Sequence, residues 1–364
     1  MHKDFLEPQD RIFLGIETSC DETAVALVSG AFSKNSYPKG HILAHKIHSQ
    51  VALHQSFGGV VPPVAASSHS LQLPALVKRL LQTAEIKPHQ IDGIGVTAGP
   101  GLAGGLLVGV MFAKGLSIAL KRPLWPIHHL QAHALVARLT HEIPFPYLVL
   151  LLSGGHCQLA VANSPRDFSL IGESTDDAPG ECLDKVARCL GYSYPGGPSI
   201  EAAAKRGDPF SIPLPIAVSE HSYNFSFSGL KTACLRWIKQ QQDLSFEKKA
   251  DLCASLQNTI TCSLGKKVSQ FLSALPPASR PAFAVVCGGV ASNEYIRQEL
   301  APYFQNYGVN LIAPPAQHCT DNGVMIAWAT YEQSFAGMEG QFDFSTRARW
   351  PINDHSLQRT KYGG

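Results

Sequence analysis

Two stretches of this chain share one pattern, and that pattern constrains the fold more than any other feature of the sequence. Ile12–Val28 and Tyr147–Val161 each read as an apolar strand, a tight polar turn and a second strand. The turns are Glu17–Thr23 and Ser153–His156, and helical and further strand-like stretches follow each pair. Strands that alternate with helices favour an α/β fold. The repeat therefore predicts two related α/β lobes, with a boundary near Pro144–Pro146.

The length and composition of the chain agree with two lobes. The 364 residues are 45% hydrophobic and 16% charged, which is typical of a soluble globular protein of two ordinary domains. We expect an N-terminal lobe made of residues 1–143 plus about 325–364, and a C-terminal lobe made of residues 144–324. A cleft between two lobes is the expected place for a functional site.

Several classes of protein are disfavoured by the sequence. The nine cysteines form no C-x-x-C pair, so we expect reduced thiols in a cytoplasmic protein. Met1–Arg11 is polar and lacks the apolar core of a secretion signal. Leu102–Leu120 is nearly all apolar, but Lys114 interrupts it and the strand-like Ile91–Thr97 precedes it, which predicts a buried helix on a sheet and no membrane span. The net charge of +2 by itself indicates no nucleic-acid partner.

A candidate metal site is the strongest functional signal. His129 and His133 are four residues apart, so both rings lie on one face of an expected helix. Asp321 precedes the apolar helix expected at Val324–Tyr331 and is the best third ligand. Two histidines and one carboxylate leave coordination positions open, as in metals that handle substrate. A zinc peptidase with an H-E-x-x-H helix needs a glutamate as general base, and Leu130 stands in its place.

Turns rich in small residues indicate a phosphate site. Thr18 and Ser19 lie in the first polar turn, while Ser153–Gly155 and Cys287–Asn293 form two glycine-bearing turns that each follow an apolar strand. Small residues let backbone N–H groups approach an anion, and a hydroxyl adds a donor. The acidic segment Asp176–Lys185 has two interpretations. It is an acidic helix start, where carboxylates oppose the dipole, or part of a nucleotide site in which Asp184 accepts hydrogen bonds from a ribose. The residues alone leave both interpretations open.

Seven motifs occur along the chain in one order. They are Gly15–Thr23, Phe57–Pro62, Thr97–Leu102, His128–His133, Ser153–His156, Phe225–Thr232 and Cys319–Gly323. Together they resemble the tRNA adenosine threonylcarbamoyltransferase family, once catalogued as O-sialoglycoprotein endopeptidases. The likeness runs from about Arg11 to Trp350. It implies two ribonuclease-H-like lobes of the actin, sugar-kinase and Hsp70-like superfamily, with a cleft between them.

The resemblance also implies a reaction and its site. The family moves a threonylcarbamoyl group from threonylcarbamoyl-adenylate to the exocyclic amine of the adenosine beside the anticodon of tRNA. It implies one divalent metal per chain, Fe²⁺ in preference to Zn²⁺, held by His129, His133 and Asp321. The implied nucleotide contacts are Leu151, Leu152, Ser153, Gly154, Gly155, Asp184, Gly197 and Asn293. The implied partners are tRNA, a paralogous protein and a small ATPase.

The proton acceptor is the least determined part of the site. Asp21 or Glu22, in the first polar turn, would take the proton that the amine loses. The alternative is that both residues only cap the turn or hold a water molecule. An ATP-dependent sugar or acyl kinase is the other class of function considered, but it would bind Mg²⁺ through carboxylates and waters and leave the histidine pair without a role.

Three segments depart from the usual pattern of the resembled family. Gln131-Ala132 stands where Glu-Gly is usual, Cys157 where threonine is usual, and Pro179–Asp184 differs at three of its six positions from Ala-Gly-Glu-Ala-Phe-Asp. None of these changes removes a candidate metal ligand. They alter hydrogen bonding around the ligands, and so are expected to affect metal choice or rate.

Overall fold

The computed structural model describes residues 10–31, 37–217, 221–354 and 356. The chain divides into two units: unit 1 is Met1–Ile143, Asn163–Phe168 and Asp321–Gly364, and unit 2 is Pro144–Ala162 and Ser169–Thr320. Two segments, 163–168 and 321–324, thus lie outside the lobe expected for them. Residues 321 and 322 go with unit 1 because they lead directly into a helix that packs on the sheet of that unit.

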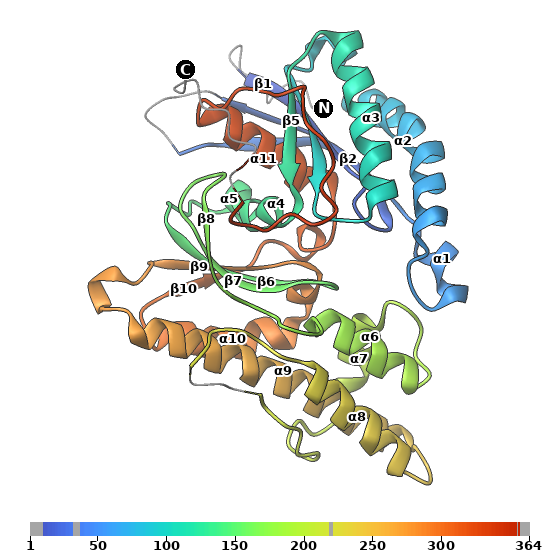
Figure 1. Ribbon diagram of the computed structural model, residues 1–364, viewed down its shortest axis with the longest axis vertical. Helices are drawn as coiled ribbons and strands as arrows, with labels where there is room; N and C mark the ends of the chain where they lie inside the picture. Colours follow the sequence, from blue (N-terminus) through green and yellow to red (C-terminus); the bar gives the residue numbers. More distant parts are fainter. Residues whose placement is uncertain (1–9, 32–36, 218–220, 355, 357–364) are drawn as a thin grey trace. The chain divides into compact units, whose positions relative to one another are not determined.

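Unit 1 is built on a five-stranded sheet (Figure 1). Its strands are β1 (Asp10–Glu17), β2 (Glu22–Ala31), β3 (Gly40–Ser49), β4 (Gly93–Gly99) and β5 (Leu124–His128). The order is β3-β2-β1-β4-β5. β1 and β3 run antiparallel to β2, β4 runs parallel to β1, and β5 runs parallel to β4. The predicted strand, turn and strand at Ile12–Val28 are β1 and β2.

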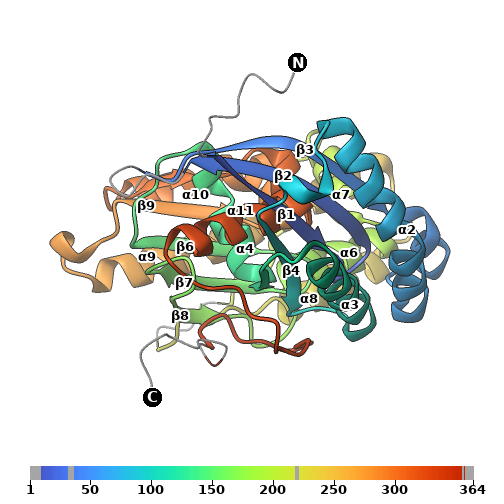
Figure 2. The ribbon, with the colours of Figure 1, turned by 90° about the horizontal axis from the view of Figure 1, so that it is seen from above.

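Helices cover both faces of this sheet. They are α1 (Val51–His54), α2 (Pro62–Ala84), α3 (Ala103–Leu120), α4 (His129–Leu135), α5 (Ala137–Thr140) and α11 (Gly323–Phe335), with the short 3-10 helices η2 (Gln55–Phe57) and η3 (Pro88–Gln90). α11 packs on β1, and α3 on β4 (Figure 2). Side chains alternate along β1: a Cβ at Gly15 would lie 2.2 Å from the backbone N of Ala327 in α11. Leu14 and Ile16 instead join a core cluster with residues of α2 and α3.

The apolar segment expected to be a buried helix is α3, and only one of its faces is buried. Leu107, Met111 and Ile118 are 54%, 58% and 66% exposed, so the prediction is wrong for the outer face. The inner face packs closely, because a Cβ at Gly105 would lie 2.3 Å from the carbonyl oxygen of Thr18. Among the described residues, α3 is the one helix whose length and composition would allow it to cross a membrane.

Unit 2 repeats the strand order of unit 1. Its strands are β6 (Tyr147–Leu152), β7 (Cys157–Ala162), β8 (Phe168–Glu173), β9 (Phe283–Cys287) and β10 (Asn310–Ile312). The sheet order is β10-β9-β6-β7-β8, with β6 antiparallel to β7 and parallel to β9, and β9 parallel to β10. β6 therefore takes the place that β1 has in unit 1. The predicted repeat of two related α/β lobes is confirmed.

The helices of unit 2 enclose one continuous core. They are α6 (Pro179–Cys189), α7 (Gly196–Ala204), α8 (Ser228–Gln240), α9 (Phe246–Ala274) and α10 (Glu294–Gln305), with η4 (Pro277–Ser279), η5 (Gly289–Ser292) and η6 (Ala316–His318). Leu148, Leu150 and Leu152 of β6 lie in this core with residues of α6 to α10. The core fixes the carboxyl ends of β6 and β9, where the glycine-bearing turns begin.

Candidate active site

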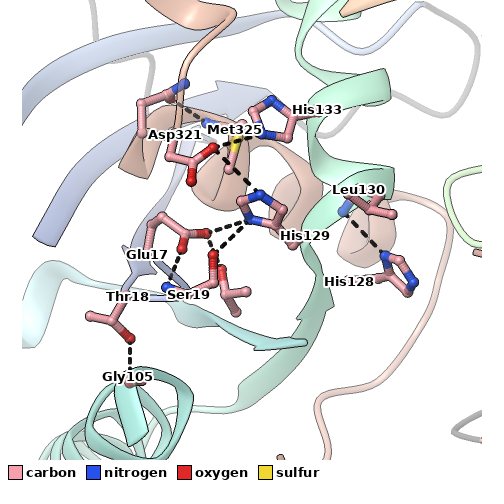
Figure 3. Close-up of polar contacts among 12 residues, drawn as sticks. Glu17, Thr18, Ser19, Gly105, His128, His129, Leu130, His133, Asp321 and Met325 are labelled. Atoms are coloured by element: carbon pink, nitrogen blue, oxygen red, sulfur yellow. Dashed lines mark hydrogen bonds and ion pairs between the residues drawn. The ribbon is translucent and has the colours of Figure 1, made fainter. Parts of the chain in front are cut away.

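Three side chains with metal-binding atoms meet in unit 1 (Figure 3). α4 presents His129 and His133 on one face, with ring centroids 4.7 Å apart. Nε2 of His129 and Nε2 of His133 lie 3.4 and 3.0 Å from Oδ1 of Asp321. One ligand atom from each residue lies within 4.8 Å of the other two. The structure therefore brings together the three residues that the sequence singled out as ligands.

Helix caps hold these side chains in place. His128 is the N-cap of α4, and its Nδ1 accepts hydrogen bonds from the backbone N–H groups of Leu130 and Gln131, at 3.2 and 3.4 Å. Asn322 is the N-cap of α11, and its Oδ1 accepts from the N–H of Met325 at 2.9 Å. Each cap is adjacent in sequence to a ligand, so the start of each helix fixes the position of one ligand backbone.

Glu17, at the end of β1, is a direct neighbour of the cluster. It is fully buried, and its Oε2 lies 3.0 Å from Nδ1 of His129. The carboxylate also accepts hydrogen bonds of 2.5 Å from the backbone N–H of Ser19 and 2.5 Å from the hydroxyl of Thr97. An Nδ1–H donated to Glu17 leaves the Nε2 lone pair of His129 for a metal. The sequence analysis did not include Glu17 among the predicted site residues. The position of an acidic residue at the end of an apolar strand was the feature that could have identified it.

The charges in this cluster favour a cation. Burial raises the pKa of Asp321, but the charge of His129 and hydrogen bonds from both histidines outweigh it and hold this pKa well below the usual range. Burial likewise opposes ionisation of Glu17, whose pKa is nevertheless lowered by His129. Burial lowers the pKa of His129, yet Asp321 and Glu17 raise it well above its usual value. Two carboxylates thus flank one buried imidazole and stabilise positive charge there.

The two candidate proton acceptors differ in their surroundings. Asp21 is buried in the turn, and its backbone carbonyl accepts a hydrogen bond of 3.0 Å from the N–H of Gln50. Glu22 begins β2, and burial followed by the charge of Asp21 raises its pKa to about 10. The two carboxyls of this turn therefore oppose each other's ionisation, and both stay candidate proton acceptors.

The hydroxyls of the first turn make contacts within unit 1. The Thr18 hydroxyl donates to the carbonyl of Gly105 at 2.9 Å, and Ser19 Oγ lies 3.2 Å from Nδ1 of His129. Thr18 therefore fastens the turn to α3. Ser19 lies beside the candidate metal ligand His129. The sequence had offered these two hydroxyls, with that of Ser153, as alternative donors to a phosphate.

The predicted nucleotide contacts all lie in unit 2. At the end of β6 the chain turns at Ser153–His156, where Ser153 Oγ accepts a hydrogen bond of 3.0 Å from the N–H of His156. A Cβ added at Gly154 or Gly155 would meet no atom within 4 Å, so the turn is open on the side to which a Cβ would project. This open, hydrogen-bonded turn has the properties of an anion-binding turn.

A second glycine turn lies beside the first. β9 is the parallel neighbour of β6, and the carboxyl ends of parallel strands meet at one edge of a sheet. Gly288 has φ +90°, and a Cβ there would lie 2.4 Å from the carbonyl oxygen of Leu152, so only glycine fits. The chain then continues through η5 to Asn293, the N-cap of α10, whose Oδ1 accepts from the N–H of Ile296 at 3.0 Å.

Asp184 joins two helices of unit 2. It lies inside α6, which begins at Pro179 and carries Glu181 in its first turn, so the predicted acidic helix start is confirmed for this segment. Its Oδ1 accepts a hydrogen bond of 2.7 Å from the N–H of Gly196, the first residue of α7. Gly197 follows, and a Cβ there would meet no atom within 4 Å. The carboxylate thus fixes the start of α7 beside an open glycine.

A cavity of about 480 Å³ lies between α7, α9 and α10. Glu201, Gln257 and Glu294 line it. Asn293 donates a hydrogen bond of 3.3 Å to Oε1 of Gln257, and the N–H of Glu294 donates one of 2.8 Å to Oε1 of Glu201. The sequence prediction omitted Glu201 and Gln257. Glu201 lies one helical turn after Gly197 on α7, and that spacing was the available signal.

Solved structures support the fold. Full-length HypF in its phosphate- and nucleotide-bound form aligns with 91% of this chain and 47% of its own, at a TM-score of 0.57 and 12% identity. Component A of the (R)-2-hydroxyglutaryl-CoA dehydratase of Acidaminococcus fermentans aligns with 90% of this chain and 99% of its own, at a TM-score of 0.51 and 14% identity. Likenesses of this kind show a shared two-lobed actin-like fold, as predicted.

Sequence comparison gives the family. The profile of the family described as tRNA N6-adenosine threonylcarbamoyltransferase matches residues 41–328. A protein of Brucella anthropi named tRNA N6-adenosine threonylcarbamoyltransferase is 44% identical, over 94% of this chain and 96% of its own length. A protein of the same name from Brucella suis is 43% identical over the same shares of the two chains. On this agreement across nearly the whole length, the chain belongs to the tRNA N6-adenosine threonylcarbamoyltransferase family.

Proposed function

We propose that this protein transfers a threonylcarbamoyl group from threonylcarbamoyl-adenylate to the exocyclic amine of the adenosine beside the anticodon in tRNA. The observation that carries the proposal is the cluster of His129, His133 and Asp321 in a chain that belongs to this family. The comparisons do not favour the kinase or the metallopeptidase. Since tRNA is the substrate, we place the reaction in the cytoplasm.

The proposed cofactor is one divalent metal per chain, Fe²⁺ in preference to Zn²⁺, held by His129, His133 and Asp321. The donor atoms fit such an ion, because they converge within 4.8 Å and two imidazoles with one carboxylate suit either metal. The flanking carboxylate of Glu17 also fits, since it selects the tautomer of His129 that offers Nε2. When bound, the metal would supply Lewis acidity toward the carbamoyl oxygen or the threonine carboxylate.

The remaining chemistry belongs to the side chains and backbone of this protein. The lone pair of an adenine amine is delocalised into the ring, so the carbamoyl carbon needs activation before the amine can attack it. The new C–N bond forms as the C–O bond to AMP breaks. In the proposal, the amides of Ser153–Gly155 hold the phosphate, Asp184 and Asn293 hold the nucleoside, and Asp21 or Glu22 takes the proton from the amine.

The direct test is transfer in a purified system. Protein with its proposed partners, given threonylcarbamoyl-adenylate and tRNA, should form threonylcarbamoyladenosine, detected by nucleoside mass spectrometry. Cells depleted of the protein should lose that nucleoside from their tRNA. Transfer activity that is absent in the complete system, with the nucleoside retained after depletion, would contradict the proposed function.

Removal of the Asp184 carboxylate should weaken nucleotide binding. In Asp184→Ala we expect the binding free energy for a non-hydrolysable adenylate analogue to weaken by about 1.5–3 kcal/mol. This is the range for a hydrogen bond to a charged group. Asp176→Ala is the matched control, because Asp176 likewise accepts a backbone hydrogen bond at a helix start, that of Ser228 in α8. Calorimetric titration compares the two. Equal affinity in wild type and Asp184→Ala would remove Asp184 from the nucleotide site.

The Glu17 carboxylate should control metal affinity without contacting the metal. It accepts three hydrogen bonds, from Ser19, Thr97 and His129. The single side-chain oxygen of glutamine cannot accept all three hydrogen bonds. Glu17→Gln should therefore weaken metal binding about 10- to 100-fold. Thr97→Val removes one donor but keeps the bond to His129, and should have a much smaller effect. Competition with a chelator measures both; unchanged affinity in Glu17→Gln would contradict the role given to this residue.

We also propose that the protein works in a complex with a paralogous protein and a small ATPase. Exposed apolar side chains on adjacent helices of unit 1 support a partner surface, namely Leu71 of α2 and Leu107, Met111 and Ile118 of α3. Large exposed apolar groups that gather on one surface are typical of protein interfaces. The modest net charge of +2 agrees with tRNA binding that is shared among several proteins.

A further inference from the structure

The chain returns to the metal-binding helix after α11. We define the C-terminal strap as Gln341–Ile352, a segment of unit 1 without helix or strand that is drawn in dark red beyond α11 in Figure 1. Phe344 and Trp350 are buried in the same core cluster as the sheet, and Ile352 is fully buried. The strap is therefore anchored by its own side chains along its length.

The strap also forms backbone hydrogen bonds at the end of β4. The N–H of Arg347 donates to the carbonyl of Ala98 at 2.7 Å, and the N–H of Gly101 donates to the carbonyl of Ala348 at 3.2 Å. The carbonyl of Phe344 accepts a hydrogen bond of 2.8 Å from Nζ of Lys114 in α3. These contacts place the strap against the sheet and α3 before it reaches α4.

Gln131 of α4 binds the end of the strap. Its Nε2 donates to the carbonyl of Ile352 at 2.9 Å and lies 3.4 Å from the carbonyl of Arg166. Both partners are acceptors, so the amide nitrogen must face them. Gln131 is buried, so its amide is shielded from bulk solvent. A leucine at this position would have a similar volume but would donate no hydrogen bond to either carbonyl.

His128 forms the second link. Its Nδ1 accepts hydrogen bonds from two backbone N–H groups at the start of α4, so the ring proton is on Nε2. Nε2 donates to the carbonyl of Trp350 at 3.0 Å, and the two rings are packed with centroids 4.7 Å apart. His128 therefore connects the first turn of α4 to the strap, one residue before a proposed metal ligand.

We propose that the C-terminal strap positions α4 for metal binding, and that His128 and Gln131 are the positioning residues that join the two. α4 has seven residues, and a helix that short is not stable by itself. Two ligands on it hold a metal well only if neighbouring structure fixes the helix. The hydrogen bonds of His128 and Gln131, on either side of His129, attach α4 to the C-terminal strap and so restrain the helix. This inference rests on the metal site proposed above.

Cobalt(II) is a suitable probe, because its absorption bands report the geometry of the ligands as well as binding. In Gln131→Leu we expect Co²⁺ affinity to fall about tenfold or more, the scale of changes around metal ligands, with altered visible bands. His128→Asn keeps a good N-cap acceptor but cannot reach the strap, so it should also lower Co²⁺ affinity and alter the visible bands. It is also the second variant if Gln131→Leu does not fold.

Lys114→Met is the matched control, since it removes a hydrogen bond of the same strap but at α3. It should leave Co²⁺ affinity and the absorption bands unchanged. Wild-type affinity and bands in both α4 variants would overturn the inference. So would equal changes in Lys114→Met, because they would show a general loss of stability. If the wild-type protein itself binds no Co²⁺, the proposed metal site fails, and that outcome is distinct from failure of the strap alone.

Discussion

Replacing His133 by alanine should slow threonylcarbamoyl transfer to tRNA roughly 100- to 1,000-fold, because a catalytic metal contributes several kcal/mol and about 1.4 kcal/mol is a factor of ten. His133 is fully buried, and its Nε2 lies 3.0 Å from Asp321. Its removal leaves two of the three ligands, so bound metal should fall together with the rate. Elemental analysis and single-turnover transfer on the same preparations measure both quantities.

His54→Ala is the control for this experiment. His54 is a second fully buried histidine of unit 1, outside the ligand cluster. His54→Ala removes a buried imidazole, as His133→Ala does. It should keep its metal content and its transfer rate per folded molecule. Full metal content in His133→Ala would contradict the ligand assignment. Loss of transfer with metal retained would instead give His133 a role other than ligation.

The second large effect is expected at Gly15 of β1. A Cβ there would lie 2.2 Å from the backbone N of Ala327 and 2.4 Å from the backbone O of Gly323, and a backbone cannot yield as a flexible side chain does. Gly15→Ala should therefore push α11 off the sheet and destabilise unit 1 by about 3 kcal/mol, the upper end for overpacking. Denaturant unfolding, followed with a probe in unit 1, measures the loss.

A glycine in α3 provides the contrast. A Cβ at Gly115 would meet no atom within 4 Å, and the residue lies inside a helix. Gly115→Ala should stabilise the protein by about 0.5–1 kcal/mol, the helix-propensity difference between the two residues. Destabilisation of similar size in both variants would mean that the close approach of α11 to β1 is not what Gly15 permits. Because Asp321 precedes α11, Gly15→Ala should also weaken metal binding.

The residues that were predictable from sequence are those whose roles follow from local spacing. The interval between His129 and His133 placed both rings on one helix face. The two strand, turn and strand patterns correspond to β1 with β2 and to β6 with β7. In each case a short stretch of chain determines the geometry, so its pattern is visible without the fold.

Roles that depend on distant parts of the chain were not predictable. Glu17 and His129 are 112 residues apart, and Gln131 and Ile352 are 221 apart. Only the folded sheet brings such pairs together. The burial of α3 was misjudged for a related reason: an apolar composition shows that a face avoids water, but not whether the chain itself covers it.

All proposed metal ligands lie in unit 1, and all predicted nucleotide contacts lie in unit 2. Metal binding and nucleotide binding can therefore be measured separately. Any effect of the metal on nucleotide affinity is energetic coupling between the two units. Thermodynamic reciprocity requires the nucleotide to change metal affinity by the same factor. Two titrations, each repeated in the presence of the other ligand, would thus measure the communication between the units as a single free energy.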